Sequence, residues 1–451
     1  MLSEYRQRFI DYQTEINREE YLFRSGRKEL WEGPELFREF SDLFRLQTVD
    51  ELRTRSEEAP AKTDATGIKR LISFALEGNV LARVHEIDEQ IEAGDEDLRA
   101  ERFDKLQDAV RSLGYPNYLA FRREIREVDY QSLAAKGIAL LSQTEEIAAS
   151  ALKHSFASEC DIPLERATPA MLSYLKFFTR FDQHFPQDQM INVYRELFAG
   201  LGFKTDRQAN VVIDVERRAH NEGGSSCYPI RIPEEIKITA CFQGGQRTYR
   251  EFFRAAGHAQ NYAWTSRNLK YEFRIGGDRA VVGSWGMLFE NLMRDRDWLH
   301  RTYGFTESQE FRQTIELRRL ISIRRQAAKL NYEVEFYSGQ LKNSAGPRYA
   351  ELLTGATGVQ VGESEYLREL SDSIYPADFL RACAFESQFR EYLKTKFGAH
   401  WWASPKAGEM LIDLWNTGQR YQVDELASMI GLGELDFDWL ATELKEKSLE
   451  R

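Results

Sequence analysis

The sequence has few of the features that mark secreted, membrane-spanning or nucleic-acid-binding proteins. Its four cysteines, Cys160, Cys227, Cys241 and Cys383, are widely spaced and include no C-x-x-C pair, which favours reduced thiols. No apolar run reaches the length of a signal-peptide core or of a membrane span. With 61 basic against 72 acidic residues, the chain lacks the dense basic surface that binds phosphate backbones. We therefore predict a cytoplasmic protein that binds neither nucleic acid nor membrane.

The composition is that of a globular protein with a sizeable core. The chain has 451 residues, of which 42% are hydrophobic and 29% are charged. Apolar residues recur at helical spacing through the first half, for example over residues 98–113, where Gly114 then ends the pattern. These features predict an N-terminal helical lobe over residues 1–130 and a second region over residues 131–451.

Strand patterns are confined to a short stretch, about residues 210–242. A β-branched run covers residues 210–216, and residues 236–242 alternate apolar with polar side chains. Pro229 and Pro233 flank residues 230–232, and prolines are found mainly in edge strands. We therefore expect two or more strands, with an edge strand beside the prolines.

A helix is predicted directly after these strands, over about residues 248–262. Gly244-Gly245 forms the turn before it, and Thr248 is the expected N-cap, with Glu251 in the capping-box position. The remaining chain is expected to be helical to the C-terminus, apart from a glycine-rich loop over residues 344–362.

This predicted helix carries a degenerate version of a metal-binding motif. In H-E-x-x-H the two histidines lie one turn apart and bind zinc, while the glutamate activates the bound water. The equivalent positions are Arg254, Ala255 and His258. A cation thus replaces one ligand and a methyl group replaces the base, so only one histidine remains.

The surrounding segments resemble the thimet-oligopeptidase and oligoendopeptidase F family of zinc peptidases. That family has a strand of the type F-C-x-P-x-x-V-P, a Gly-Gly turn, the H-E-x-G-H helix, and a segment of the type G-D-x-x-V-T-E-x-x-A-x-L-F-E. The resemblance covers roughly residues 130–445, and its segments follow the family's order and spacing. The matching stretches are Cys227–Pro233, Gly244-Gly245, Arg254–His258 and Gly277–Glu290.

The resemblance implies a mainly α-helical, two-lobed, zincin-like fold with a small β-sheet, in which residues 131–451 form the peptidase-like region around an internal cleft. It also implies that Gly283 occupies the place of the third zinc ligand and that Tyr375 occupies the region from which active relatives polarise the scissile carbonyl. Because one imidazole cannot hold zinc, we predict that no zinc or other cofactor is bound. We further expect Arg254 to replace the charge of the metal and to pair with Glu290.

The resulting functional prediction is a catalytically inactive peptidase homologue, a pseudopeptidase, whose cleft binds a peptide or a protein partner. The strand over residues 236–242 is expected to be an edge that holds an extended peptide. Three alternatives stay open, namely an enzyme with a rewired, zinc-independent site, a metallopeptidase with unrecognised replacement ligands, and a purely structural subunit that regulates or pairs with an active relative. In the rewired enzyme His258, Tyr375 and Arg254 serve as acid, donor and anion clamp. The sequence does not indicate an oligomeric state.

Other interpretations of the candidate residues were weighed against these roles. His258 is expected to be a hydrogen-bonded core histidine rather than an acid or base, and Tyr375 a packed aromatic in preference to a functional hydroxyl. A Cys227–His258 nucleophile pair and a metal site of His220, His258 and His300 are both disfavoured.

Overall fold

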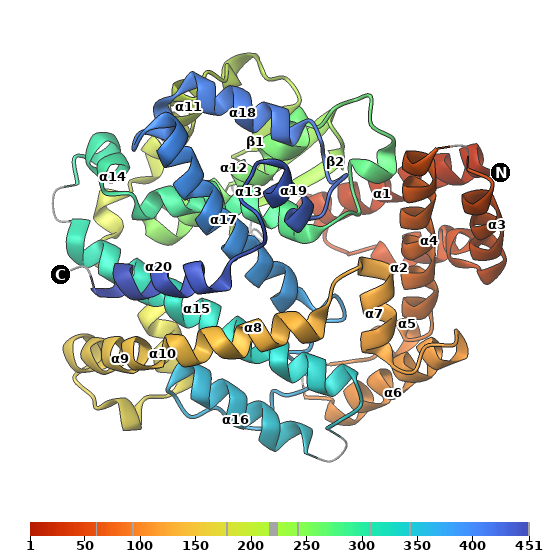
Figure 1. Ribbon diagram of the computed structural model, residues 1–451, viewed down its shortest axis with the longest axis horizontal. Helices are drawn as coiled ribbons and strands as arrows, with labels where there is room; N and C mark the ends of the chain where they lie inside the picture. Colours follow the sequence, from red (N-terminus) through yellow and green to blue (C-terminus); the bar gives the residue numbers. More distant parts are fainter. Residues whose placement is uncertain are drawn as a thin grey trace. The chain divides into compact units, whose positions relative to one another are not determined.

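The computed structural model describes residues 1–59, 61–92, 94–176, 179–215, 224–240, 243–305, 308–341 and 344–449. Helices dominate these ranges, and the strands within them form one small sheet (Figure 1). The predicted mainly α class with a small β-sheet is therefore confirmed. Within the same ranges, no helix combines the length and the apolar character needed to cross a bilayer.

The first of two compact units carries the sheet. It is assembled from the segments Met1–Asn79, Thr179–Thr306 and Gln388–Glu434. Its elements are α1 (Leu2–Arg24), α2 (Gly33–Glu39), α3 (Leu46–Glu57), α11 (Met190–Gly200), β1 (Val211–Asp214), β2 (Ser226–Arg231), β3 (Glu235–Thr239), α12 (Gly245–Trp264), α13 (Arg279–Glu290), α14 (Arg296–Tyr303), α18 (Pro405–Trp415) and α19 (Val423–Met429). It also contains most of α4 (Lys62–Ala82) and the second half of α17 (Tyr375–Phe397).

The second unit is helical. It combines the segments Val80–Phe178, Glu307–Ser387 and Leu435–Arg451. Its elements are α5 (His85–Asp88), α6 (Glu96–Ser112), α7 (Tyr118–Arg126), α8 (Tyr130–Gln143), α9 (Glu145–Cys160), α10 (Pro169–Lys176), α15 (Ser308–Tyr337), α16 (Ala345–Thr357), α20 (Phe437–Leu449) and the first half of α17. The helix predicted over residues 98–113 is confirmed as α6.

The strand order of the sheet is β1-β3-β2, with β1 parallel and β2 antiparallel to β3. β3 is therefore the central strand, and the prediction of an edge strand over residues 236–242 is wrong; residues 241 and 242 lie outside the described ranges. The physical reason is that Ile236 and Ile238 are fully buried and both sides of β3 are hydrogen-bonded. β2, which contains Pro229, is an edge strand as predicted.

α12 begins three residues earlier than predicted, at Gly245, so Thr248 lies inside the first turn and is not its N-cap. The cap comes from a distant part of the chain, because a carboxylate oxygen of Asp182 accepts a hydrogen bond from the backbone N–H of Gln246 at 2.9 Å. Gly244, the N-cap residue, has a φ of 70°, which favours glycine. A cap from a residue so far away in sequence leaves no local signal.

The predicted loop over residues 344–362 is also wrong, because most of it forms α16. Tyr349, Leu353 and Ala356 are spaced at i, i+4 and i+7, and they are buried in one core cluster with Ala328 and Tyr332 of α15. This packing outweighs the low helix propensity of the glycines in the segment.

Two glycines allow α12 and α13 to pack with their backbones close together. A Cβ atom on Gly257 of α12 would collide with the carbonyl oxygen of Trp285 on α13, and a Cβ atom on Gly286 would collide with the ring of His258. Trp285 itself is fully buried against Phe389 and Trp415. The two helices that carry the degenerate motif are thus held by backbone contact as well as by side-chain packing.

We predict that Gly257→Ala lowers the free energy of unfolding by about 1–3 kcal/mol, because the added methyl group overpacks this contact. Gly355→Ala is the matched control, since a Cβ atom at this helical position in α16 meets no atom within 4 Å. The control should raise stability by about 0.5–1 kcal/mol through helix propensity. Urea denaturation of both variants measures the difference, and equal effects would refute the close approach of the helices.

Candidate functional site

α12 and α13 bring two arginines onto one carboxylate. Arg250 and Arg254 are four residues apart in α12, so their side chains lie on the same face, one turn apart. Nε of Arg254 donates to Oε2 of Glu290 at 2.5 Å, and Nη2 of Arg250 donates to Oε1 of the same carboxylate. Glu290, the last residue of α13, is buried. The predicted pairing of Arg254 with Glu290 is therefore present.

The charges of this cluster explain why Glu290 is ionised although it is buried. Burial alone raises the pKa of a carboxyl group, but Arg254 and Arg250 outweigh it and lower the pKa of Glu290 to about 2. Two guanidinium charges and one carboxylate leave the cluster with a net charge of one positive unit. The side chain of Arg254 is 37% exposed and that of Arg250 is 20% exposed, so part of this positive charge reaches solvent.

His258 lies one turn after Arg254, and its imidazole is neutral. Burial and the nearby charge of Arg254 together lower the pKa of His258 to about 4, against the opposing effect of Glu290. Its Nε2 atom is buried and has no hydrogen-bond partner among the described residues. The ring lies against Gly286, where a Cβ atom would collide with Nε2.

The remaining motif positions offer no further metal ligand. Ala255 is buried, and its methyl group stands where the motif has its base. Gly283, on α13, has no side chain that could coordinate a metal. Among the described residues, no three His, Cys, Asp or Glu side chains are grouped as metal ligands.

The side chains of Arg254, His258 and Glu290 do not form a set of ligands for a zinc ion. The guanidinium of Arg254 has no lone pair and repels a divalent cation. Both oxygens of Glu290 accept hydrogen bonds from arginine, and Nε2 of His258 faces Gly286. No mechanistic step through a metal follows from these residues.

The other candidates belong to different elements or lie outside the described ranges. Tyr375 is the first residue of α17, belongs to the second unit and is 43% exposed. Its backbone N–H donates to Oγ of Ser371 at 3.4 Å. Burial raises the pKa of the Cys227 thiol well above its usual range, so a thiolate is strongly disfavoured. His220 lies outside the described ranges, and His300 lies on α14.

Two residues that shape this site, Arg250 and Gly286, were not predicted from the sequence. Arg250 precedes Arg254 by one helical turn, and this spacing was the available signal for a second cation on the same face. Gly286 had no comparable signal, because its effect depends on a contact with His258 on another helix.

Comparison with known proteins identifies the fold. No protein-family model matches the chain, and no curated protein sequence matches it significantly. Among solved structures, metallocarboxypeptidase 1 of Trypanosoma cruzi is 12% identical with a TM-score of 0.63, and the match covers 99% of this chain and 100% of that one. An M32 carboxypeptidase from Deinococcus radiodurans is also 12% identical, with a TM-score of 0.64 and coverage of 99% and 98%.

A carboxypeptidase from Pyrococcus furiosus, in an apo-Mg form, agrees with these two. It is 14% identical with a TM-score of 0.62, and the match covers 99% of this chain and 98% of that one. The chain has the helical, zincin-like fold of M32 carboxypeptidases. At these identities the likeness concerns the fold, and it extends over nearly the whole length of each chain.

We predict that His258 makes the folded state sensitive to mild acid. Its folded pKa of about 4 lies below the ordinary value of 6.5, so protonation favours the unfolded chain, and the contribution of His258 to stability falls as the pH drops from 6.5 towards 4. Glu290, whose pKa is about 2, loses its stabilising effect only below pH 4.5. Between pH 6.5 and 4.5 the contribution of His258 should reach about 2 kcal/mol.

Urea denaturation at several pH values measures this slope. His258→Leu should remove this contribution, so that the free energy of unfolding of the unaltered chain falls by about 2 kcal/mol relative to that of the variant between pH 6.5 and 4.5. The control His154→Leu, at an exposed position of α9, should show no such pH-dependent difference. An unchanged slope in His258→Leu would show that His258 is not held neutral by its surroundings.

Proposed function

We propose that this chain is a pseudopeptidase, a protein with a carboxypeptidase fold that binds peptides or a protein partner without hydrolysing them through zinc. One observation supports the proposal: Arg254, at the position that the resembled motif gives to a zinc ligand, pairs with Glu290, which also accepts a hydrogen bond from Arg250. A permanent cation on the helix and a carboxylate engaged by two guanidinium groups together make a stable substitute for a metal site.

The pattern of substitutions supports the same conclusion. Loss of one zinc ligand alone would leave a cluster of carboxylates with no cation to neutralise it. In this chain the carboxylates expected at positions 255 and 283 are both missing, and Glu290, which remains, is neutralised by Arg254 and Arg250. We infer a coordinated replacement within a fold related to the thimet-oligopeptidase and oligoendopeptidase F pattern of segments.

A zinc-independent hydrolase in the same fold is less well supported. Such an enzyme would use His258 as an acid, but the pKa of His258 is lowered to about 4 and its Nε2 atom is buried against Gly286. A neutral imidazole without access to a ligand is a poor proton donor at neutral pH.

The direct test is metal content together with peptide hydrolysis. The purified protein is dialysed against zinc, its bound zinc is measured by mass spectrometry, and hydrolysis of quenched-fluorescent and N-blocked peptides is followed with and without a chelator. We expect substoichiometric zinc and no hydrolysis above the buffer control. Stoichiometric zinc with chelator-sensitive hydrolysis would refute the proposal, and chelator-resistant hydrolysis would favour the rewired enzyme.

Restoring the motif provides an independent prediction. Arg254→His, Ala255→Glu and Gly283→Glu, combined in one chain, should create zinc binding with one ion per chain, because three protein ligands then converge beside a base. The matched control adds His258→Ala to the triple variant and should abolish this binding. Isothermal titration with zinc measures both. A triple variant that folds but ignores zinc would show that α12 and α13 do not superimpose on a metal site.

A further inference from the structure

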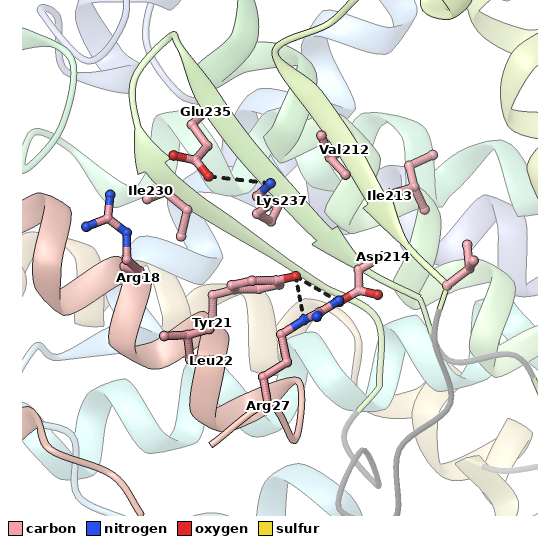
Figure 2. A pocket seen from close by; sticks show the side chains of 11 residues that line it. Arg18, Tyr21, Leu22, Arg27, Val212, Ile213, Asp214, Ile230, Glu235 and Lys237 are labelled. Atoms are coloured by element: carbon pink, nitrogen blue, oxygen red, sulfur yellow. Dashed lines mark hydrogen bonds and ion pairs between the residues drawn. The ribbon is translucent and has the colours of Figure 1, made fainter. Parts of the chain in front are cut away.

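The pocket between α1 and the sheet indicates no particular ligand, although it has a volume of about 530 Å³. Figure 2 shows Lys237 paired with Glu235, and the hydroxyl of Tyr21 bonded to Asp214 and Arg27. Every charged side chain of the lining has a partner of opposite sign within the chain. A buried carboxyl group in the second unit has a more specific chemistry.

This group is Glu333 of α15, which is fully buried and whose two carboxyl oxygens have different surroundings. Oε1 accepts a hydrogen bond from the backbone N–H of Ser371 at 3.2 Å. Oε2 is buried and has no hydrogen-bond partner among the described residues. An ionised carboxylate in this place would lose its hydration without full compensation, so the surroundings favour a protonated, neutral carboxyl group.

The charges nearest to Glu333 act in the same direction as its burial. Burial raises the pKa of Glu333 to about 8, and the negative charges of Asp372 and Glu369 also raise it. Lys329, one turn earlier in α15, and the N–H of Ser371 lower the pKa, but their effect is smaller. The proton therefore stays on Glu333 at neutral pH.

The elements packed around Glu333 supply the remaining charged and titratable groups. Arg102 of α6 is paired with Asp372, and Arg325 of α15 is paired with Glu369. α8 presents no side chain where it packs most closely, because Gly137 lies against Ala327 of α15. The other groups are Tyr332 and Tyr337 of α15, Tyr118 and Arg122 of α7, and Tyr349 of α16.

Residues 371–374, here called the strap, connect to several of these helices. Arg102 binds both carboxylate oxygens of Asp372, at 3.0 and 2.6 Å. The hydroxyl of Tyr118 donates to the carbonyl oxygen of Asp372 at 2.9 Å. Together with the bond to Glu333, these contacts hold the strap between α15 and the start of α17.

The strap ends in strained backbone. Ile374 has a φ of 52°, in the left-handed region, which is unfavourable for a β-branched residue. Its side chain is fully buried, and its N–H donates to the carbonyl oxygen of Ser371 at 2.8 Å. Such a conformation persists only while surrounding contacts enforce it, so a weaker hold on Ser371 favours release of the strap.

We propose that Glu333 is a proton-operated latch that holds the strap closed while it is protonated and releases it on ionisation. When the proton passes to solvent, the carboxylate gains hydration only if its cover moves, and Ser371 is the part of this cover that is bonded to it. Release also breaks the hydrogen bond from the N–H of Tyr375 to Oγ of Ser371, so the latch controls the first residue of α17. The latch lies within the second unit and does not depend on the proposed loss of peptidase activity.

Hydrogen exchange of the strap amides in the full chain, between pH 6 and 9, tests the latch. With the strap open, Glu333 ionises near its ordinary pKa of 4.5, whereas with the strap closed its pKa is about 8, so rising pH favours the open form. The protection factors of Ser371 and Ile374, corrected for the intrinsic exchange rate at each pH, should fall about tenfold per pH unit between pH 6 and 8. Ile323, buried in the middle of α15, should stay at least about tenfold better protected than Ser371, because the release is local.

A pair of variants assigns this pH dependence to Glu333. Glu333→Gln keeps the shape and an acceptor for the N–H of Ser371 but cannot ionise, so its protection factors should not change between pH 6 and 8. Glu146→Gln, at an exposed position of α9, is the matched control and should keep the fall of the unaltered chain. Infrared spectra should show the carbonyl band of a protonated carboxyl group at pH 7, which Glu333→Gln lacks and which disappears with a midpoint near pH 8.

A fall in the unaltered chain and in Glu146→Gln, but not in Glu333→Gln, would support the latch. Constant protection of Ser371 in the unaltered chain, an equal fall in Glu333→Gln, equal protection of Ser371 and Ile323, or the absence of the infrared band would overturn it. Because the unaltered chain alone supplies three of these four results, the test stays decisive if Glu333→Gln does not fold.

Discussion

The arrangement of the candidate site depends on the close approach of α12 and α13. Gly257 and Gly286 are the positions at which this approach leaves no room for a Cβ atom. The same approach sets the imidazole of His258 against Gly286 and brings the end of α13 within reach of the arginines of α12. A wider separation would leave Glu290 buried without a partner, which is far more costly than a buried pair. The close packing of α12 against α13 and the neutralisation of Glu290 by the arginines therefore depend on each other.

Charged side chains link the two helices that carry the degenerate motif. A structural or catalytic metal neutralises its ligands and links the elements that supply them. Here the link between α12 and α13 is made by guanidinium and carboxylate groups, with Glu290 kept ionised by Arg250 and Arg254. These three side chains together carry one positive charge, part of which is exposed to solvent.

Local patterns were sufficient to predict much of this structure. Helical spacing predicted α6, the order of the degenerate segments predicted the fold class, and the replacement of a ligand by a cation led to the prediction that Arg254 pairs with Glu290. The errors have a common cause, which is that long-range contacts leave no local trace. β3 is central because β1 and β2 both pair with it, and α12 starts early because Asp182 caps it from 64 residues away. The orientation of His258 likewise depends on Gly286, on another helix.

The ion-pair cluster has a consequence for how the site can change in evolution. Arg254→His alone removes one of the two partners of Glu290, and Ala255→Glu alone places a carboxylate at a buried position. Neither step gains a metal, because binding requires several ligands at once. Each of these single substitutions is therefore unfavourable on its own, and only their combination supplies a set of metal ligands.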